Sequence, residues 1–180
     1  MRVTQRRSRL RLCDLFLSMQ KITALLHTQN DGLRLGRCLE ALYPCDEVLI
    51  IDHGSNDGTL QVAREYGARV VSAESGAAPG SYMRLANARW ILCLESCESL
   101  TESLAASLYE WKSEELRASA SRVQAFSMFV REETASGWVD NPAAQTRLVP
   151  SEWDRWQGRL PVNDPNAVSL EGEILRFVLP

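Results

Sequence analysis

Apolar and polar positions follow a regular block pattern over the first two thirds of the chain. Four short runs with apolar centres have the length and composition of strands buried in a sheet, namely residues 21–27, 47–51, 69–72 and 90–94. Three stretches between them place apolar residues at helical spacing, namely residues 31–43, 59–66 and 82–88. Strands and helices therefore alternate, which is the pattern of a parallel sheet with right-handed crossover connections.

A fourth helix follows the last of these strands. Ser99 and Glu102 fit a capping box, in which each side chain bonds a free backbone N–H at the start of the helix. Leu104, Leu108 and Trp111 then fall on one helical face. We therefore expect this helix to pack against the sheet through those three residues.

The last third of the chain has a different pattern. Its strand-like runs are separated by irregular chain with several tryptophans and prolines, and they cover residues 123–130, 145–149 and 172–178. Helical spacing is weak here, so these runs do not continue the strand–helix alternation. We expect them to extend the same sheet in an antiparallel or mixed arrangement, without forming a second domain.

Composition and charge limit the classes of function. The chain has 180 residues, of which 45% are apolar and 24% charged, as is usual for a globular protein. A net charge of −3 argues against general nucleic-acid binding, and no apolar run is long enough to span a membrane. Five cysteines at irregular spacing do not resemble a disulfide framework, so we expect a reducing cytoplasm.

The first 20 residues differ from the remainder in charge, because they carry five arginines and a single acid. They are either a basic tail that contacts a membrane surface or an acidic partner, or an extension outside the domain. In the second case they are disordered, or translation begins at Met19. The segment lacks the long apolar region of a signal peptide. We therefore begin the folded domain at Lys21 and expect at most peripheral membrane contact.

Acidic side chains occur at or just after the carboxyl ends of the predicted strands, where open parallel sheets bind ligands. They are Asp31, Asp52, Asp57, Glu95 and Glu98. Carboxylates in one crevice repel each other unless a positive or hydrogen-bonding group lies between them. A divalent metal, or the N–H and hydroxyl groups of a nucleotide, would supply that group. Simpler interpretations exist for three of them, with Asp31 and Asp57 as helix caps and Glu98 as a solvated loop residue.

Asp52 is the strongest candidate for a ligand contact. It ends an apolar strand and points into a Gly-Ser turn. Asn56 or Asp57 already provides a cap for the helix that follows this turn. We therefore interpret Asp52 as a ligand-binding residue.

Two segments resemble the family 2 glycosyltransferases, whose fold is called GT-A. Residues 25–31 (Leu-Leu-His-Thr-Gln-Asn-Asp) resemble the family's apolar strand followed by Thr-Lys-Asn-Glu. Residues 46–59 (Asp-Glu-Val-Leu-Ile-Ile-Asp-His-Gly-Ser-Asn-Asp-Gly-Thr) match, without a gap, the family's Asp-Glu-Ile-Val-Val-Val-Asp-Ser-Gly-Ser-Thr-Asp-Gly-Thr. The resemblance covers about residues 21–112 well and extends weakly to the end of the chain. It points most closely to bacterial transferases of the lipopolysaccharide-core type.

The resemblance implies an α/β fold, a three-layer α/β/α sandwich with a mostly parallel central sheet, in one domain over residues 21–180. Residues 21–117 would form its nucleotide-binding half and residues 118–180 its acceptor-side half. The implied reaction is the inverting transfer of a sugar from a nucleoside-diphosphate sugar to an acceptor glycan or lipid. The implied place is the bacterial cytoplasm, at the inner face of the membrane, in the synthesis of cell-envelope glycans.

The resemblance also implies roles for individual residues. Thr28 and Asp31 would lie against the base and the ribose, and Asp52 would accept a hydrogen bond from the base. The full set of implied nucleotide-sugar contacts is Thr28, Asn30, Asp31, Asp52, Gly54, Ser55, Asp57 and Arg84.

The catalytic and metal-binding positions match the family less closely. Glu95 and Glu98 are the implied ligands of Mg²⁺ or Mn²⁺, but Cys97 stands where the family has a second aspartate. A thiol weakens the binding of these oxygen-preferring ions. Asp140 is the candidate catalytic base, with a simple turn residue as the alternative. Arg176 stands where the family often has a histidine.

These differences leave a second hypothesis open, namely a catalytically impaired relative that serves as a nucleotide-binding or partner-binding module. A nucleotidyltransferase is disfavoured, because no glycine-rich, basic loop follows the first strand.

Overall fold

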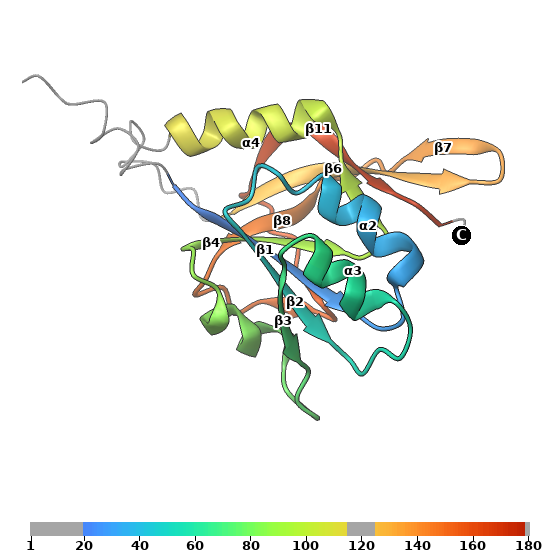
Figure 1. Ribbon diagram of the computed structural model, residues 1–180. Coiled ribbons are helices and arrows are strands. Elements are labelled where there is room, and N and C mark those ends of the chain that lie inside the picture. The colour runs from blue at the N-terminus through green and yellow to red at the C-terminus, as the bar shows by residue number, and fades with distance from the viewer. Residues whose placement is uncertain (1–19, 115–124, 179–180) are drawn as a thin grey trace, which may run out of the picture.

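A computed structural model describes residues 20–114 and 125–178 (Figure 1). The expected basic extension over residues 1–20 lies outside these ranges, apart from Gln20. The elements in chain order are β1 (Ile22–Thr28), α2 (Gly32–Glu40), β2 (Glu47–Asp52), α3 (Thr59–Glu65), β3 (Arg69–Ser72), the 3-10 helix η1 (Pro79–Leu85), β4 (Trp90–Glu95), β5 (Glu98–Leu100), α4 (Glu102–Glu114), β6 (Phe126–Thr134), β7 (Gly137–Asp140), β8 (Gln145–Pro150), β9 (Trp156–Gln157), β10 (Leu160–Pro161) and β11 (Val168–Arg176).

One large sheet runs through the molecule in the order β3-β2-β1-β4-β8-β6-β11-β5, with β7 paired to β6 (Figure 1). Strand β1 is parallel to β2 and β4, and β2 is parallel to β3. Strand β8 is antiparallel to β4 and β6, whereas β11 is parallel to β6 and antiparallel to β5. The carboxyl ends of β1, β2, β3, β4, β6 and β11 therefore lie along one edge of the sheet.

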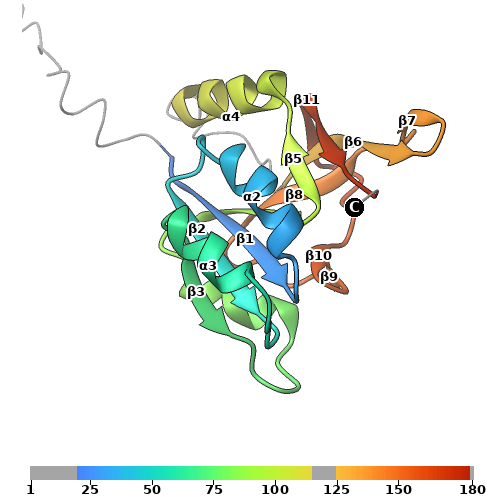
Figure 2. The same ribbon diagram turned by 45° about the vertical axis from the view of Figure 1, so that its right-hand side comes forward.

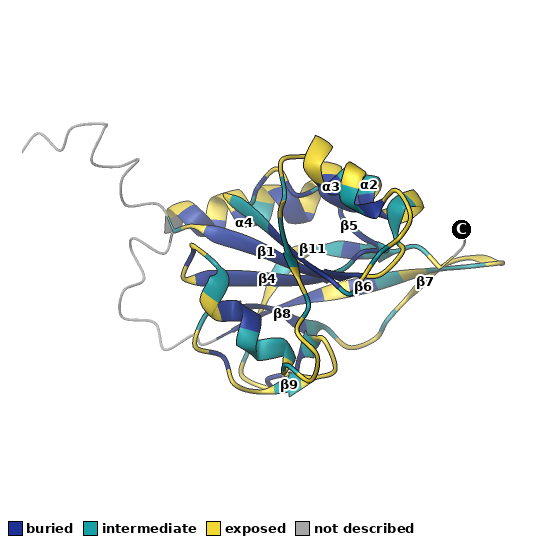
Figure 3. Cartoon of the chain, turned by 60° about the horizontal axis from the view of Figure 1, so that its bottom comes forward, coloured by how far each residue is buried: buried dark blue, intermediate teal, exposed yellow. Residues whose placement is uncertain are grey.

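The two faces of the sheet are covered by different kinds of structure (Figure 3). Helices α2, α3 and α4 cover one face, where Leu35, Ala63 and Leu104 belong to one apolar core. The other face is covered by η1 and the irregular chain after β8, which bring Met83 and Trp153 into a second core. The predicted α/β class with a mostly parallel sheet is confirmed. In the described residues, however, the second outer layer consists of a 3-10 helix and irregular chain.

A small two-stranded sheet, β9–β10, follows β8, and β10 contacts both β4 and β8 (Figure 2). None of the helices that the structure describes combines the length and apolarity that a membrane crossing requires.

Most predicted elements are present, with shifted ends. The strand over residues 69–72 is confirmed with the same bounds, whereas the helix predicted over residues 82–88 is a 3-10 helix at Pro79–Leu85. The expected mixed extension of the sheet by the last third of the chain is also confirmed. Short strands β5, β7, β9 and β10 were not predicted, because two to four residues carry too little periodicity to be recognised.

The capping box predicted at Ser99 was wrong. Ser99 lies inside β5, and the start of α4 is capped by Thr101, whose hydroxyl accepts the Leu104 N–H at 3.3 Å. The same hydroxyl donates to the Glu173 carbonyl at 3.0 Å. A long-range pairing between β5 and β11 therefore determines where the helix begins.

Strand β11 depends on a glycine where it passes α4. Its register with β6 shifts between Ser169 and Glu173, and Gly172 in this irregular segment has a φ of +94°. A Cβ on Gly172 would lie 2.2 Å from the backbone nitrogen of Leu104. The absence of a side chain therefore allows β11 to lie directly against the first turn of α4.

We expect Gly172→Ala to lower the free energy of unfolding by about 2–4 kcal/mol, because it adds a backbone clash to an unfavourable φ. Gly67→Ala is the matched control, since Gly67 also has a positive φ of +70° but open space around its Cβ position. That control carries only the backbone strain, about 1–2 kcal/mol. Urea unfolding of the two variants measures the difference, and equal losses would contradict the close-approach explanation.

Candidate functional site

The polar residues predicted to bind a ligand begin at the carboxyl ends of neighbouring strands. Thr28 is opposite Asp52 in the register of β1 with β2, and Asp52 is opposite Ser72 in that of β2 with β3. On the other side of β1, His27 is opposite Glu95 of β4. The parallel register therefore brings Thr28, Asp52 and Glu95 to one edge of the sheet, as the sequence led us to expect.

The carboxylate of Asp52 is fixed by the turn that follows it. Its Oδ2 accepts the N–H groups of Gly54 at 3.1 Å and Ser55 at 3.0 Å. Its Oδ1 accepts the hydroxyl of Ser55 at 2.5 Å and that of Thr28 at 3.3 Å. Burial alone would raise the pKa of Asp52, but these hydrogen bonds outweigh burial and lower it. Asp52 is therefore a buried, ionised and immobilised acceptor.

Hydrogen bonds through Asn30 join the loop after β1 to the loop after β2. The N–H of Asn30 donates to Ser55 Oγ at 2.9 Å, and Asn30 Oδ1 accepts the N–H of Asn56 at 2.9 Å. Asn30 has a φ of +58°, a conformation that asparagine tolerates better than most residues. The two loops therefore form one surface beside Asp52.

Asp57 and Asp31 have different local roles. The Asp57 carboxylate accepts the N–H of Thr59 at 2.9 Å and that of Gly32 at 3.1 Å. Asp57 precedes Gly58, the N-cap residue of α3, and its carboxylate holds the first N–H of both α3 and α2. Asp31 precedes α2, but its carboxylate accepts the N–H of Gln29 at 2.8 Å and makes no capping bond to the helix. Asp31 therefore shapes the loop after β1.

Two of the expected site residues lie on other elements. Arg84 is exposed on η1, which covers the face of the sheet opposite the helices. Asp140 lies on β7, and its carboxylate accepts a hydrogen bond from Arg131 Nε at 2.6 Å. The structure therefore groups the loop residues after β1 and β2 tightly, and places Arg84 and Asp140 outside that group.

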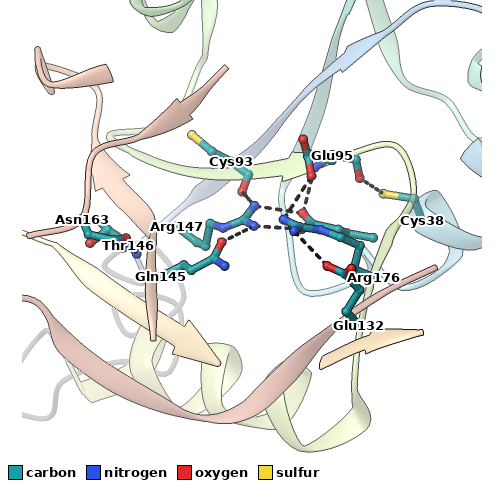
Figure 4. Close-up of polar contacts among 10 residues, drawn as sticks. Cys38, Cys93, Glu95, Glu132, Gln145, Thr146, Arg147, Asn163 and Arg176 are labelled. Carbon is teal, nitrogen blue, oxygen red and sulfur yellow. Dashed lines mark hydrogen bonds and ion pairs between the residues drawn. The ribbon is translucent and has the colours of Figure 1, made fainter. Parts of the chain in front are cut away.

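The loop after β4 is organised around Glu98, whose donors are Arg147, Arg176 and Glu95, the three residues labelled at the centre of Figure 4. Arg147 donates to the two oxygens of Glu98 at 2.8 and 2.9 Å, and Arg176 donates to Oε1 at 2.9 and 3.1 Å. The backbone N–H of Glu95 completes the set at 2.9 Å from Oε2. The side chains of Glu98 and Arg147 are both 0% exposed, so the interpretation of Glu98 as a solvated loop residue was wrong.

The residues expected to bind a divalent metal do not fit one. The N–H donors around Glu98 fill the lone-pair positions that a carboxylate offers. Glu95 is paired with Arg176 at 3.1 Å. Burial, and then the carboxylates of Glu98 and Glu95, raise the pKa of the Cys97 thiol, which remains protonated and a poor ligand. Residues 20–114 and 125–178 contain no group of three or more His, Cys, Asp or Glu arranged to hold a metal.

Sequence reasoning gave Arg147 no role, although a signal was available. Arg147 lies between Thr146 and Leu148 in a strand that is otherwise buried, and a charge at such a position requires partners. Besides Glu98, it donates to the Cys93 carbonyl at 3.2 Å and to Gln145 Oε1 at 2.8 Å. The partner could not be identified from the sequence, because Glu98 lies 49 positions earlier in the chain.

Comparison with known proteins shows which sequences this chain resembles. No family model matches the chain. A TPR repeat-containing protein from Synechococcus elongatus is 30% identical over 128 residues, which are 68% of this chain and 30% of that protein. The lipopolysaccharide core biosynthesis glycosyltransferase LpsC from Rhizobium meliloti is 38% identical over 45 residues, or 25% of this chain and 17% of LpsC. The chain therefore spans less than a third of the length of these relatives.

Among solved structures, that of a mycobacterial protein matches with a TM-score of 0.58 at 15% identity, over 88% of this chain and 65% of that chain. This likeness concerns the fold alone, and the structural neighbours of the chain are GT-A glycosyltransferases. The chain has the fold of the GT-A glycosyltransferases and resembles the glycosyltransferase LpsC over a quarter of its sequence.

A part-buried pair of histidines lies next to the loops after β1 and β2. His27 Nδ1 is 2.9 Å from His53 Nε2, and the His27 ring meets Tyr82 edge-on. Burial, followed by the nearby His53 and Arg159, lowers the pKa of His27 to about 4. His27 is therefore neutral at physiological pH and fills the end of the sheet beneath the Asp52 turn.

We expect Arg147→Met to lower the free energy of unfolding by about 3–5 kcal/mol, because the buried Glu98 carboxylate loses half of its charge partners. The double variant Arg147→Met with Glu98→Leu should recover at least half of that loss. Arg69→Met is the control, since Arg69 is 41% exposed and Glu47 keeps its donors Thr23 and Asn87 without it, so that this ion pair contributes about 1 kcal/mol or less. Urea unfolding measures these losses. If Arg147→Met lost as little unfolding free energy as Arg69→Met, the burial of the Glu98–Arg147 pair would be contradicted.

His27 also predicts a dependence of stability on pH. Because its pKa falls from 6.5 in the unfolded chain to about 4 in the fold, protonation favours unfolding. The contribution of neutral His27 to the free energy of unfolding is fully present above pH 6.5. It declines by about 3 kcal/mol as the pH falls towards 4. His27→Gln cannot be protonated, so its unfolding free energy should decline correspondingly less over this range. His53→Gln should keep most of the wild-type decline, because burial is the larger cause.

Proposed function

We propose that this chain binds a nucleoside-diphosphate sugar at the edge formed by the loops after β1 and β2, and transfers the sugar with inversion to an acceptor hydroxyl on a glycan or lipid. The observation that carries the proposal is the state of Asp52. It is a buried acceptor, held ionised by three neighbouring residues, at the strand ends where open α/β sheets bind their ligands. The likeness to GT-A glycosyltransferases supports the same assignment.

The nucleoside half of the donor suits these loops. We assign to Asp52, at the end of β2, the hydrogen bond from a ring N–H of the base, which takes the place of its longest bond, the one from the buried Thr28 hydroxyl at 3.3 Å. Asn30 and Asp31 line the adjoining loop and are directed by its hydrogen bonds to Ser55 and Gln29. We assign the base and the ribose to this surface.

The acceptor suits a cavity of about 370 Å³ between β8 and the β9–β10 hairpin. Its lining is mixed, with the amides of Gln145 and Asn163 beside Leu160 and Pro161. Amides with an apolar floor are the usual combination for a sugar ring. Asn141 also lines this cavity and follows Asp140 directly, which supports Asp140 as the candidate base.

The proposed reaction is a single displacement. The acceptor oxygen forms a bond to the anomeric carbon of the sugar, while the bond from that carbon to the diphosphate breaks. Asp140 takes the proton from the acceptor hydroxyl, for which it must release Arg131. The short match to LpsC supports a cell-envelope acceptor of the lipopolysaccharide-core kind, used on the cytoplasmic side of a bacterial membrane.

Calorimetric titration with uridine, cytidine, guanosine, adenosine and thymidine diphosphates tests the donor site. We expect one of them to bind, and Asp52→Asn to weaken that binding by about tenfold or more, because a hydrogen bond to a charged group contributes about 1.5–3 kcal/mol. Glu152→Gln is the control, since this exposed carboxylate lies near Arg89 at the other end of β4.

The same preparation tests transfer. With the matching nucleotide sugar and a bacterial envelope extract, the wild type should release nucleoside diphosphate, and Asp140→Asn should slow the release by about a hundredfold or more. Binding of none of the five diphosphates would overturn the donor site. Binding without any release would favour a nucleotide-binding module over an enzyme.

A further inference from the structure

The loop after β4 carries its own cation. Arg176 reaches from β11 into the space between three carboxylates, with Nη2 at 2.9 Å from Glu98 and 3.1 Å from Glu95, and Nη1 at 3.5 Å from Glu132 (Figure 4). Strand register determines this position, because Arg176 is opposite Glu98 in β5 and opposite Glu132 in β6. A guanidinium is therefore built into the place where oxygen ligands from three strands converge.

We propose that Arg176 replaces the divalent metal at this edge, so that the chain excludes Mg²⁺ and Mn²⁺ and holds a diphosphate through the guanidinium. The exclusion of metal follows from the residues alone. The diphosphate contact rests on the function proposed above.

The exclusion follows from charge and geometry. Glu95, Glu98 and Glu132 bring three negative charges, which Arg176 and the buried Arg147 reduce to one. Burial alone would lower the pKa of Arg176, but the Glu98 and Glu95 carboxylates outweigh burial and raise it, so the charge is permanent. A metal ion would have to displace a cation that is already hydrogen-bonded to its ligands.

The guanidinium is also positioned to contact a diphosphate. Nε and Nη2 are directed at Glu98 and Glu95, which holds the plane of the group. Nη1 makes only the long contact with Glu132 among the described residues, and Glu132 is itself 48% exposed. The two N–H groups of Nη1 therefore remain for phosphate oxygens, a geometry in which arginine binds well.

Rigidity comes from the residues behind Arg176. Glu98 is held by both guanidinium nitrogens of Arg147 and by the N–H of Glu95. Arg147 is held in turn by the Cys93 carbonyl and Gln145. The cation is therefore pre-oriented, which lowers the entropy cost of binding an anion.

Titration with Mn²⁺ alone, followed by the electron paramagnetic resonance signal of free Mn²⁺, tests the exclusion without any nucleotide. We expect no binding by the wild type at micromolar concentrations, and at least tenfold tighter binding by Arg176→Gln, because three carboxylates then lack their central cation. Arg131→Gln is the matched control, since Arg131 also bridges two carboxylates, those of Asp140 and Glu173, outside this cluster. Arg176→Lys keeps the charge and should exclude Mn²⁺ as the wild type does.

Titration with the five nucleoside diphosphates, in EDTA and again in Mn²⁺, tests the diphosphate contact. The wild-type affinity should agree within twofold in the two conditions, whereas Arg176→Gln should lose about tenfold in EDTA and recover in Mn²⁺. Three results would each overturn the proposal. The first is micromolar Mn²⁺ binding by the wild type, and the second is a gain in Mn²⁺ affinity in Arg131→Gln equal to that in Arg176→Gln. The third is a tenfold loss, in EDTA, of the wild-type affinity for the diphosphate. If no diphosphate binds, the proposed binding of a nucleoside-diphosphate sugar is wrong. The Mn²⁺ titration alone then still decides whether the site excludes the metal ion.

Discussion

The buried contact between Glu98 and Arg147 is the constraint on which the arrangement of this molecule depends. Both side chains are completely removed from solvent, where a charge is tolerated only when it is paired and hydrogen-bonded, and Arg147 Nε alone lacks a partner among the described residues. Glu98 is on β5 and Arg147 on β8, while the carbonyl that also binds Arg147 belongs to β4. One ionic contact therefore fixes how the antiparallel strands join the parallel half of the sheet.

The parallel half has a different organisation. Its strand ends are covered by loops that satisfy their own polar groups, since Asp52 and Asp57 accept the N–H groups of their own turn and helix. Asn30 connects the two loops without help from the rest of the chain. The ends of β1 and β2 thus combine bonds within one turn with bonds between residues 24 to 26 positions apart, whereas the acidic loop after β4 relies on residues 49 and 78 positions away.

This difference explains how much could be predicted from the sequence. The strands and helices up to α4 have clear periodicity, and the segment around Asp52 is a long local match, so the fold class and the grouping of Thr28 and Asp52 at one edge of the sheet could be predicted. The surroundings of Glu98 were not, because Arg147 and Arg176 lie 49 and 78 positions away. The capping residue of α4 was missed for the same reason, since β11 determines the start of that helix through Thr101.

The place of Arg176 on β11 has a consequence for how the molecule is made. Every other described strand is synthesised before β11, so a growing chain presents Glu98 with only part of its donors. Until β11 pairs with β5 and β6, the cluster of carboxylates lacks its second guanidinium. Its charges then attract water and cations, and the loop does not pack against the sheet. The acidic loop therefore acquires its complete set of donors only after β11, the last strand that the structure describes, has been added.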